Sequence, residues 1–426
     1  MSTAVLSESA ALRLRGGVFT AALLLVWVST NPFQPRLGEE VAASGNIVNQ
    51  IAFSSMALIA LGSLALIDRR ALLAYATPVY GLMLAWLMVS VAVSANPDVS
   101  LRAFLFMLTV LIIAGCAMVM PQSERQFATL IGAAALIVLL ICYAGLAAFP
   151  GVAIHSEGDA LEPEHAGAWR GLFDHKNIAG AMMAVFLMIG IYVAGARSLA
   201  LGLTIAGLAA VFLFSTGSKT SMALGPAVLV LTSVAAWFRS TLVRALLILG
   251  PLLIALSMTV GTVLSPTLKA VLDGISPGQT FTGRTEIWDF AIDRIWERLY
   301  TGHGLEGFWG SDRVRFAEID EGQTGIAQGM VHAHNSYVDA IVSMGLPGFA
   351  IVILTLVLLP FRDWMRAAHA PSNERMALLF ARIWLFALYN ACLETFFFRR
   401  ADPVWFALLI AILGLRLVAT WRIREA

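Results

Sequence analysis

The chain has 426 residues, of which 59% are hydrophobic and only 13% are charged, and its formal net charge is +1. A soluble domain carries about a quarter charged residues, so this composition excludes an ordinary water-soluble globular protein. The three cysteines lie inside apolar runs, which indicates small core side chains and not a disulfide framework or a zinc motif.

Long apolar runs recur along nearly the whole chain and predict an all-α polytopic membrane protein with about twelve transmembrane helices. The first run is interpreted as an uncleaved span and not as a secretory signal. In chain order the predicted spans are residues 17–31, 49–67, 71–94, 101–120, 127–149, 177–196, 199–214, 220–237, 245–264, 336–359, 377–396 and 405–420.

The distribution of lysine and arginine between the runs predicts the orientation, because short cytoplasmic loops are rich in these residues. It places both termini in the cytoplasm, with Arg399 and Arg400 as the exception on the outer side. The chain then divides into three regions. Residues 1–264 contain nine spans and an outer loop at 150–176. Residues 265–335 form a large outer loop with amphipathic helices, and residues 336–426 contain three spans. Six of the seven histidines fall in the two outer loops, which favours extracytoplasmic chemistry over transport, since a transporter concentrates polar groups at mid-membrane.

Two basic turns precede the sixth and eighth predicted spans. The stretch "WRGLFDHKNIAG" (169–180) brings Arg170, His175 and Lys176 to the start of one helix, either as an anion site or as basic residues near lipid phosphate. The stretch "STGSKTSM" (215–222) contains Lys219 but lacks the spacing of a phosphate-binding loop, so it predicts no ATP site.

The large outer loop contains "TFTGRTEIWDFAIDRIWERLYTGHGLEGFW" (280–309). Apolar residues after Arg284 recur at three- and four-residue spacing, which predicts an amphipathic helix with Trp288 and Trp296 at the bilayer surface. Arg284 precedes this helix, so its guanidinium and the helix N–H groups could face an anion; the alternative is an arginine that only solvates a loop. His303 follows in the same stretch.

The stretch "VHAHNSYVDAIVSMGLPG" (331–348) places His334 and Asn335 at the start of the tenth predicted span, followed by Gly345 and Gly348. Histidine can take a proton near neutral pH, and the glycines permit close packing of another helix. The alternative is a polar capping cluster. A zinc site of His303, His332 and His334 is not expected, because no ligand motif accompanies them.

Two features of the last spans are interpreted as structural and not as functional. Glu394 falls inside the eleventh predicted span, where an ion pair with Arg382 or snorkelling to the surface is expected. Phe396, Phe397 and Phe398 are expected to form an interfacial aromatic belt.

A histidine, then asparagine, nine residues, and then G-x-x-G resembles the signature of the superfamily of O-antigen ligases and O-antigen or exopolysaccharide polymerases. His334, Asn335, Gly345 and Gly348 fit it at every position, and the resemblance covers about residues 170–348. It implies a glycosyltransferase of the bacterial inner membrane with a periplasmic active site. Its donor would be an undecaprenyl-diphosphate-linked oligosaccharide and its acceptor a lipid-linked repeat unit or lipid A-core.

The resemblance also assigns roles. It implies that Arg284 holds the donor diphosphate, that Lys219 stands where the family often has a phosphate-binding arginine, and that His334 is the candidate catalytic base. Further residues implied at the diphosphate are Arg170, His175 and Lys176, and those implied in support are Asn335, His303, His332, Gly345 and Gly348. Membrane lipids and a chain-length regulator are candidate partners, whereas no cofactor, metal or nucleic acid is expected.

The motifs "FDHKN", "SKT" and "GHGLEGFW" favour an exopolysaccharide polymerase of the succinoglycan type. An O-antigen ligase is the alternative and a polysaccharide transporter a remote one. A membrane scaffold or a metal sensor would not need His334 and Arg284 for glycan synthesis.

Overall fold

The computed structural model describes residues 7–33, 47–68, 71–157, 163–278, 281, 283–319, 324–367 and 374–420. Within these ranges the regular structure is helical, apart from one isolated bridge between Ile154 and Trp169. The described part contains nine helices long and apolar enough to cross a membrane, which confirms the prediction of an all-α polytopic membrane protein. The terminal residues 1–6 and 421–426, expected in the cytoplasm, lie outside the described residues.

Each of the twelve predicted spans falls on a helix, but three of these helices have fewer than 18 residues. The nine long ones are α1 (Glu8–Val28), α3 (Ile47–Ile67), α5 (Pro97–Met118), α6 (Glu124–Ala148), α8 (Lys176–Ala196), α10 (Lys219–Trp237), α11 (Thr241–Met258), the run Ser336–Ala367 and α19 (Pro403–Thr420). The run consists of α16 (Ser336–Val352), a π-helical turn (Ile353–Leu358) and α17 (Leu359–Ala367).

The three shorter helices are α4 (Pro78–Ala92), α9 (Leu199–Ser215) and α18 (Glu374–Asn390). The predicted span 71–94 is divided because a 3-10 turn at Ala71–Tyr75 precedes α4, whose N-cap residue is Thr77. The predicted span 377–396 is also too long, since α18 ends at Asn390 and a loop follows.

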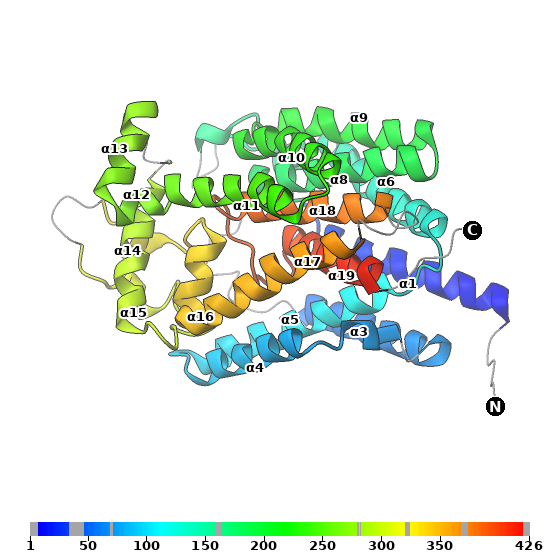
Figure 1. Ribbon diagram of the computed structural model, residues 1–426, viewed down its shortest axis with the longest axis horizontal. Helices are drawn as coiled ribbons and strands as arrows, with labels where there is room; N and C mark the ends of the chain where they lie inside the picture. Colours follow the sequence, from blue (N-terminus) through cyan, green and yellow to red (C-terminus); the bar gives the residue numbers. More distant parts are fainter. Residues whose placement is uncertain are drawn as a thin grey trace.

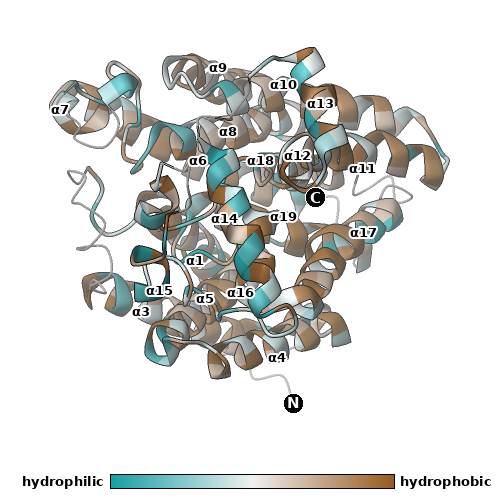
Figure 2. Cartoon of the chain, turned by 90° about the vertical axis from the view of Figure 1, so that its left-hand side faces the viewer, coloured by the Kyte–Doolittle hydropathy of each residue, from teal (hydrophilic) through white to brown (hydrophobic). Residues whose placement is uncertain are grey.

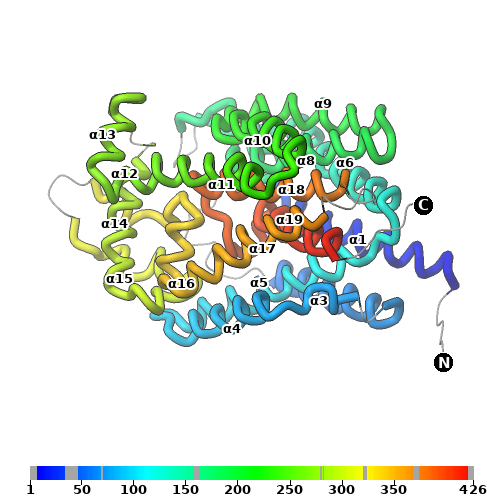
Figure 3. The backbone as a smooth tube through the Cα atoms, in the orientation of Figure 1, coloured from blue at the N-terminus to red at the C-terminus, as the bar shows by residue number. Residues whose placement is uncertain are grey.

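The long helices lie side by side along the longest axis of the molecule (Figure 1). One end of this bundle holds the short helix α12 (Gly261–Leu264) and the elements of the large loop, which are α13 (Pro266–Ile275), α14 (Arg284–Glu297) and α15 (Asp312–Arg315). The smooth trace in Figure 3 shows that α1 begins and α19 ends at the opposite end. The large loop is therefore separated from the first residue of α1 and the last residue of α19 by the length of the bundle.

Helix α14 crosses the end of the bundle and carries the predicted apolar stripe. Its buried residues Ile287, Ala291 and Ile295 belong to the same core cluster as Val338 and Val342 of α16. Seen end-on, hydrophilic residues gather on α14 and on the loops around it (Figure 2). The apolar stripe therefore packs α14 onto the start of α16. The opposite, polar face of α14 lies at the end of the bundle.

The two tryptophans of α14 have different surroundings. Trp296 is 68% exposed, and its interfacial position stays a prediction. Trp288 is fully buried and donates its Nε1–H to the carbonyl oxygen of Ala333 at 2.9 Å, so its predicted place at the bilayer surface is wrong. Its position in the helical period places it on the core side of α14.

The loop between α18 and α19 is folded inward. Phe396, Phe397 and Phe398 are each at most 6% exposed and pack in the core, so the predicted aromatic belt is wrong. Arg400, one of the two arginines that depart from the orientation pattern, pairs through Nη2 with Oε2 of Glu306 at 2.5 Å. This contact ties the loop to the large loop.

Two glycines of α16 allow close packing, as their motif predicts. A Cβ on Gly348 would lie 2.2 Å from Nε1 of Trp86 on α4. Gly345 has φ 67° and ψ −179°, and a Cβ there would lie 2.6 Å from the carbonyl carbon of Tyr300. At Gly345 the close neighbour is thus a loop backbone and not another helix, and the amide of Leu346 donates to the carbonyl oxygen of Leu299 at 2.7 Å.

We expect Gly345→Ala to lower the free energy of unfolding by about 1–3 kcal/mol, because an L-residue is strained in this conformation and its methyl group meets backbone. Gly250→Ala in α11 is the control, since a Cβ there meets nothing within 4 Å. Thermal unfolding of the detergent-solubilised variants, followed by tryptophan fluorescence, measures the difference. Equal midpoints for the two variants would contradict this account of the break in α16.

Candidate active site

The start of α16 is fixed by a fully buried asparagine. Oδ1 of Asn335 accepts the N–H groups of Tyr337 at 3.0 Å and Val338 at 3.1 Å, which caps the helix. Nδ2 donates to the carbonyl oxygen of Cys392 at 2.7 Å, and the backbone N–H donates to Oγ1 of Thr395 at 3.0 Å. Asn335 therefore serves both as a helix cap and as a tie to the loop after α18.

Ser336 strengthens the same tie from the next position. Its N–H donates to the carbonyl oxygen of Ala391 at 2.9 Å, and its Oγ donates to the carbonyl oxygen of Glu394 at 2.9 Å. Oγ also accepts the N–H of Phe396 at 3.0 Å. We call the contacts of Asn335 and Ser336 with residues 391–396 the loop clamp.

Asp339, one turn into α16, holds the histidine loop against the clamp. Its carboxylate accepts the N–H of Ala333 at 3.1 Å, the Nε1–H of Trp309 at 2.6 Å and the hydroxyl of Thr395 at 2.5 Å. Three separate segments therefore meet at one carboxylate, and Ala333 lies between His332 and His334. The backbone around both histidines is fixed as a consequence.

His334 and His332 are neighbours in space as well as in sequence, with ring centroids 4.1 Å apart. His334 has φ 51°, an unusual conformation for a residue with a side chain, and its N–H donates to Nδ1 of His332 at 3.2 Å. Burial first, and then the neighbouring His334, Arg399 and Arg284, hold the pKa of His332 well below its usual range. His332 is therefore a neutral hydrogen-bond acceptor that supports the backbone of His334.

Arg284 is the first residue of α14, and its guanidinium reaches the loop after α18. Nη2 lies 3.0 Å from Oε1 of Glu394, and Nη1 donates to the carbonyl oxygen of Leu393. Oε2 of Glu394 lies 3.9 Å from Nδ1 of His334. Arg284 and His334, 50 positions apart in the sequence, therefore meet at one carboxylate.

The structure corrects the expected role of Glu394. It lies in the loop after α18 and contacts Arg284, not Arg382, which donates to Oγ1 of Thr232 and Oγ of Ser233. Burial raises the pKa of Glu394. Arg284 and His334, with a smaller contribution from His175, lower this pKa by more than burial raises it, so the net shift is downward. Glu394 is therefore an anion at neutral pH.

Helix α8 brings an amide and a histidine to the same place. Nδ2 of Asn177 donates to Oε1 of Glu394 at 2.9 Å, and His175 caps α8 by accepting the N–H of Asn177 on Nδ1 at 3.1 Å. The ring of His175 also packs with those of His155 and His165, with centroid distances of 5.4 and 5.6 Å. His175 therefore lies near Glu394, while its Nδ1 accepts the hydrogen bond that caps α8.

The other predicted cations occupy the same end of the bundle but different surroundings. Arg170 is 6% exposed and donates to the carbonyl oxygens of Val152 and Asp174, so part of its guanidinium holds its own loop. The backbone N–H of Lys176 donates to Nε2 of His155 at 3.2 Å. Roles of both side chains in binding an anion stay predictions.

Lys219 begins α10 and is exposed. Its neighbour Ser218 packs against α8, where a Cβ on Gly180 would lie 2.6 Å from the Ser218 Cβ. The turn before α10 is therefore adjacent to the start of α8. The described residues give no contact between the Lys219 side chain and Glu394.

His303 is placed away from catalysis. It is 2% exposed, donates from Nε2 to the carbonyl oxygen of Arg294 at 2.8 Å and packs against Phe308, and burial lowers its pKa. Its backbone N–H donates to Val342 of α16 at 2.8 Å. Among the described residues no group of three or more His, Cys, Asp or Glu side chains could hold a metal ion.

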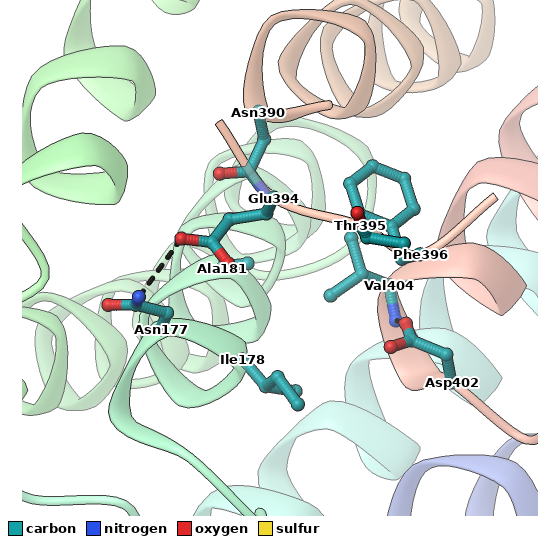
Figure 4. A pocket seen from close by; sticks show the side chains of 9 residues that line it. All are labelled: Asn177, Ile178, Ala181, Asn390, Glu394, Thr395, Phe396, Asp402 and Val404. Atoms are coloured by element: carbon teal, nitrogen blue, oxygen red, sulfur yellow. Dashed lines mark hydrogen bonds between the residues drawn. The ribbon is translucent and has the colours of Figure 1, made fainter. Parts of the chain in front are cut away.

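A small pocket opens beside Glu394, between α8, the end of α18 and the start of α19 (Figure 4). The polar wall of the pocket consists of Asn177, Glu394, Asn390 and Thr395. Asp402, which caps α19, lines the pocket near the start of that helix. Glu394 lines this pocket, whereas Arg284 and His334 do not, so Glu394 is the residue that the pocket shares with the charged site.

Sequence reasoning missed Glu394, Asp339 and Asn177 as members of this site. Glu394 was recognised only as a rare charge in an apolar run, and this was the one available signal, since intramembrane charges mark functional sites by default. Asp339 lies four residues after Asn335, within the first turn of α16, and Asn177 directly follows the basic turn. Their contacts join segments that are far apart in the sequence.

These observations define a multi-pass helical membrane protein with a cationic and imidazole-bearing site at one end of its bundle. Residues 181–353 match the family described as O-antigen ligase, and this match supports the resemblance to the superfamily of O-antigen ligases and polymerases. The matched range contains Lys219, Arg284, His334 and Asn335. No curated protein matches the chain.

We expect Asn335→Ala to lower the free energy of unfolding by about 2–4 kcal/mol, because it removes a cap and leaves the buried carbonyl group of Cys392 without its donor. Asn96→Ala is the control, since Asn96 also precedes a helix but makes no capping bond there. Denaturation monitored in detergent gives both values. Similar small losses in the two variants would show that the loop clamp does not depend on Asn335.

Proposed function

We propose that the protein is a metal-independent, inverting glycosyltransferase of the inner membrane. It transfers a glycan from an undecaprenyl-diphosphate donor to a sugar hydroxyl on the periplasmic face. The observation that carries this proposal is the meeting of Arg284 and His334 at Glu394, at the end of the bundle opposite to the first residue of α1 and the last of α19. The O-antigen ligase match at residues 181–353 supports the reaction class.

Arg284 acts on the leaving group. When the bond between the anomeric carbon and the diphosphate oxygen breaks, its electron pair stays on the diphosphate, where negative charge grows. A fixed guanidinium stabilises that charge and presents a planar fork to phosphate oxygens. The N-terminus of α14, where Arg284 lies, adds backbone N–H groups that favour an anion.

His334 acts on the acceptor. A sugar hydroxyl is a weak acid, and an imidazole at hydrogen-bond distance can take its proton while the oxygen attacks the anomeric carbon. One displacement forms the new glycosidic bond, inverts the anomeric centre and needs no covalent enzyme intermediate. Cleavage of the bond between the anomeric carbon and the diphosphate supplies the driving force, so no nucleotide cofactor takes part.

Further residues bind the donor or support the site. Three cations lie on segments around the start of α8 and contribute positive charge near the diphosphate: Lys219, Arg170 and Lys176. His175, which caps α8, is a further candidate contact of the diphosphate. Asn335, His332 and His303 hold the backbone, and Gly345 and Gly348 permit the packing of α16. Membrane lipids surround the bundle, and a chain-length regulator is a candidate partner.

Polymerisation of repeat units is the preferred reaction, on the motifs "FDHKN", "SKT" and "GHGLEGFW". Ligation of the glycan to lipid A-core is the second candidate, and the match to the O-antigen ligase family favours it. Both reactions use the same donor chemistry and differ in the acceptor.

We expect His334→Ala to reduce turnover about 10²–10⁴-fold, as for loss of a general base. We expect Arg284→Ala to reduce it about 10²–10³-fold, as for loss of one donor to a developing charge. Arg294→Ala on the same helix is the control, because the Arg294 side chain contacts Glu297 and the ring of Phe290 and not Glu394. Glycan transfer by purified protein and complementation of a polymer-deficient strain give the readouts, with expression checked. Normal polymer from His334→Ala would refute the proposal and favour a scaffold or transporter.

The acceptor is identified by supplying purified protein with lipid-linked repeat units and no lipopolysaccharide core. We expect long chains to form, because a polymerase uses a second repeat unit as its acceptor. A protein that is inert under these conditions but active once lipid A-core is added is a ligase. The length of the product, resolved by gel electrophoresis, separates the two reactions.

A further inference from the structure

Glu394 lies outside every motif that led to the candidate site, yet it touches both principal residues. We propose that Glu394 is the positioning residue of the site: Oε1 holds the guanidinium of Arg284, and Oε2 selects the tautomer of His334 whose Nε2 is free to take a proton. The inference rests on the proposed function and adds a residue and a specific atomic role to it.

The backbone of Glu394 is fixed relative to His334. Its carbonyl oxygen accepts both the N–H of Ser336 at 3.2 Å and the hydroxyl of the same residue at 2.9 Å. Its own N–H donates to the carbonyl oxygen of Asn390 at 2.9 Å. Because Ser336 is two residues after His334, the loop clamp sets the separation between carboxylate and imidazole.

The first carboxylate oxygen has two donors. Nη2 of Arg284 lies 3.0 Å from Oε1 and Nδ2 of Asn177 lies 2.9 Å from the same atom. Figure 4 shows the Asn177 side chain directed at Glu394 across the pocket. These two donors come from α14 and α8, so they fix the direction of the carboxyl group from two sides.

The second carboxylate oxygen faces the imidazole. Oε2 lies 3.9 Å from Nδ1 of His334, and this nitrogen is buried and has no hydrogen-bond partner among the described residues. A bare Nδ1 would direct a lone pair at an anion, whereas a protonated Nδ1 is attracted to it. Catalytic hydrogen bonds are often long without substrate and shorten when it binds.

The tautomer follows from this contact. In a neutral imidazole one nitrogen carries hydrogen and the other a lone pair. With hydrogen on Nδ1, the lone pair belongs to Nε2, and the His334 side chain is 26% exposed, so the ring remains reachable from outside the core. The left-handed backbone of His334, held by Nδ1 of His332, is a costly conformation of the kind retained at functional sites.

Glu394→Gln tests the proposal, with Glu297→Gln as the matched control. Glu297 also pairs with arginines, Arg294 and Arg313, but at the surface of α14. We expect Glu394→Gln to reduce turnover about 10- to 100-fold, the loss typical of a hydrogen bond to a charged group, and Glu297→Gln to remain near wild type. Thermal unfolding of each variant verifies folding.

Nitrogen NMR of ¹⁵N-histidine-labelled protein reads the tautomer, with the His334 signals assigned from His334→Gln. In the wild type we expect hydrogen on Nδ1 and a bare Nε2, and in Glu394→Gln a shift towards the other tautomer. The wild-type spectrum decides the question even where Glu394→Gln does not fold. Hydrogen on Nε2 in the wild-type protein would overturn the inference.

The two proposals fail in different ways. Wild-type turnover and an unchanged tautomer in Glu394→Gln, together with an inactive His334→Ala, would overturn the role of Glu394 and leave the glycosyltransferase intact. Reduced turnover with an unchanged tautomer would also overturn it, because the loss would then be structural. Full activity of His334→Ala and Arg284→Ala would instead overturn the proposed function.

Discussion

The site depends on the hydrogen bonds by which Asn335 and Ser336 hold the loop after α18. Two adjacent residues cap α16 and bind residues 391–396 through four backbone or side-chain groups. Because these groups are buried, each lost bond would leave a polar atom unsatisfied and cost about 1–3 kcal/mol. The clamp is therefore strong enough to keep an irregular loop folded into a helical bundle.

The charges of the site are arranged around that clamp. Glu394 comes from the clamped loop, Arg284 from α14 and His334 from the turn before α16, so three segments contribute one group each. Removing an unpaired carboxylate from water costs free energy. The guanidinium of Arg284, the amide of Asn177 and the imidazole of His334 offset this cost for Glu394. The same pairing keeps Arg284 ordered at a helix N-terminus where an anion can approach.

The sequence was sufficient for the fold class and for the helices, because apolar runs and helical spacing are local properties. It also selected His334, Asn335 and Arg284 as candidate site residues, since their motifs are contiguous. It was insufficient for Glu394, whose apolar neighbours extended the predicted span beyond Asn390, where the clamp ends α18. The burial of Trp288 and the aromatic run depends on tertiary packing, which hydropathy alone does not reveal.

The shortness of α4 affects the surrounding bilayer, because most of this helix is not buried in the bundle. Its 15 residues rise about 23 Å, whereas the hydrocarbon layer is about 30 Å thick. The bilayer beside α4 must become thinner, or headgroups and water must move inward towards the ends of the helix. Because Trp86 of α4 packs against Gly348 of α16, acyl-chain length would also set how deeply the candidate site at the start of α16 is immersed.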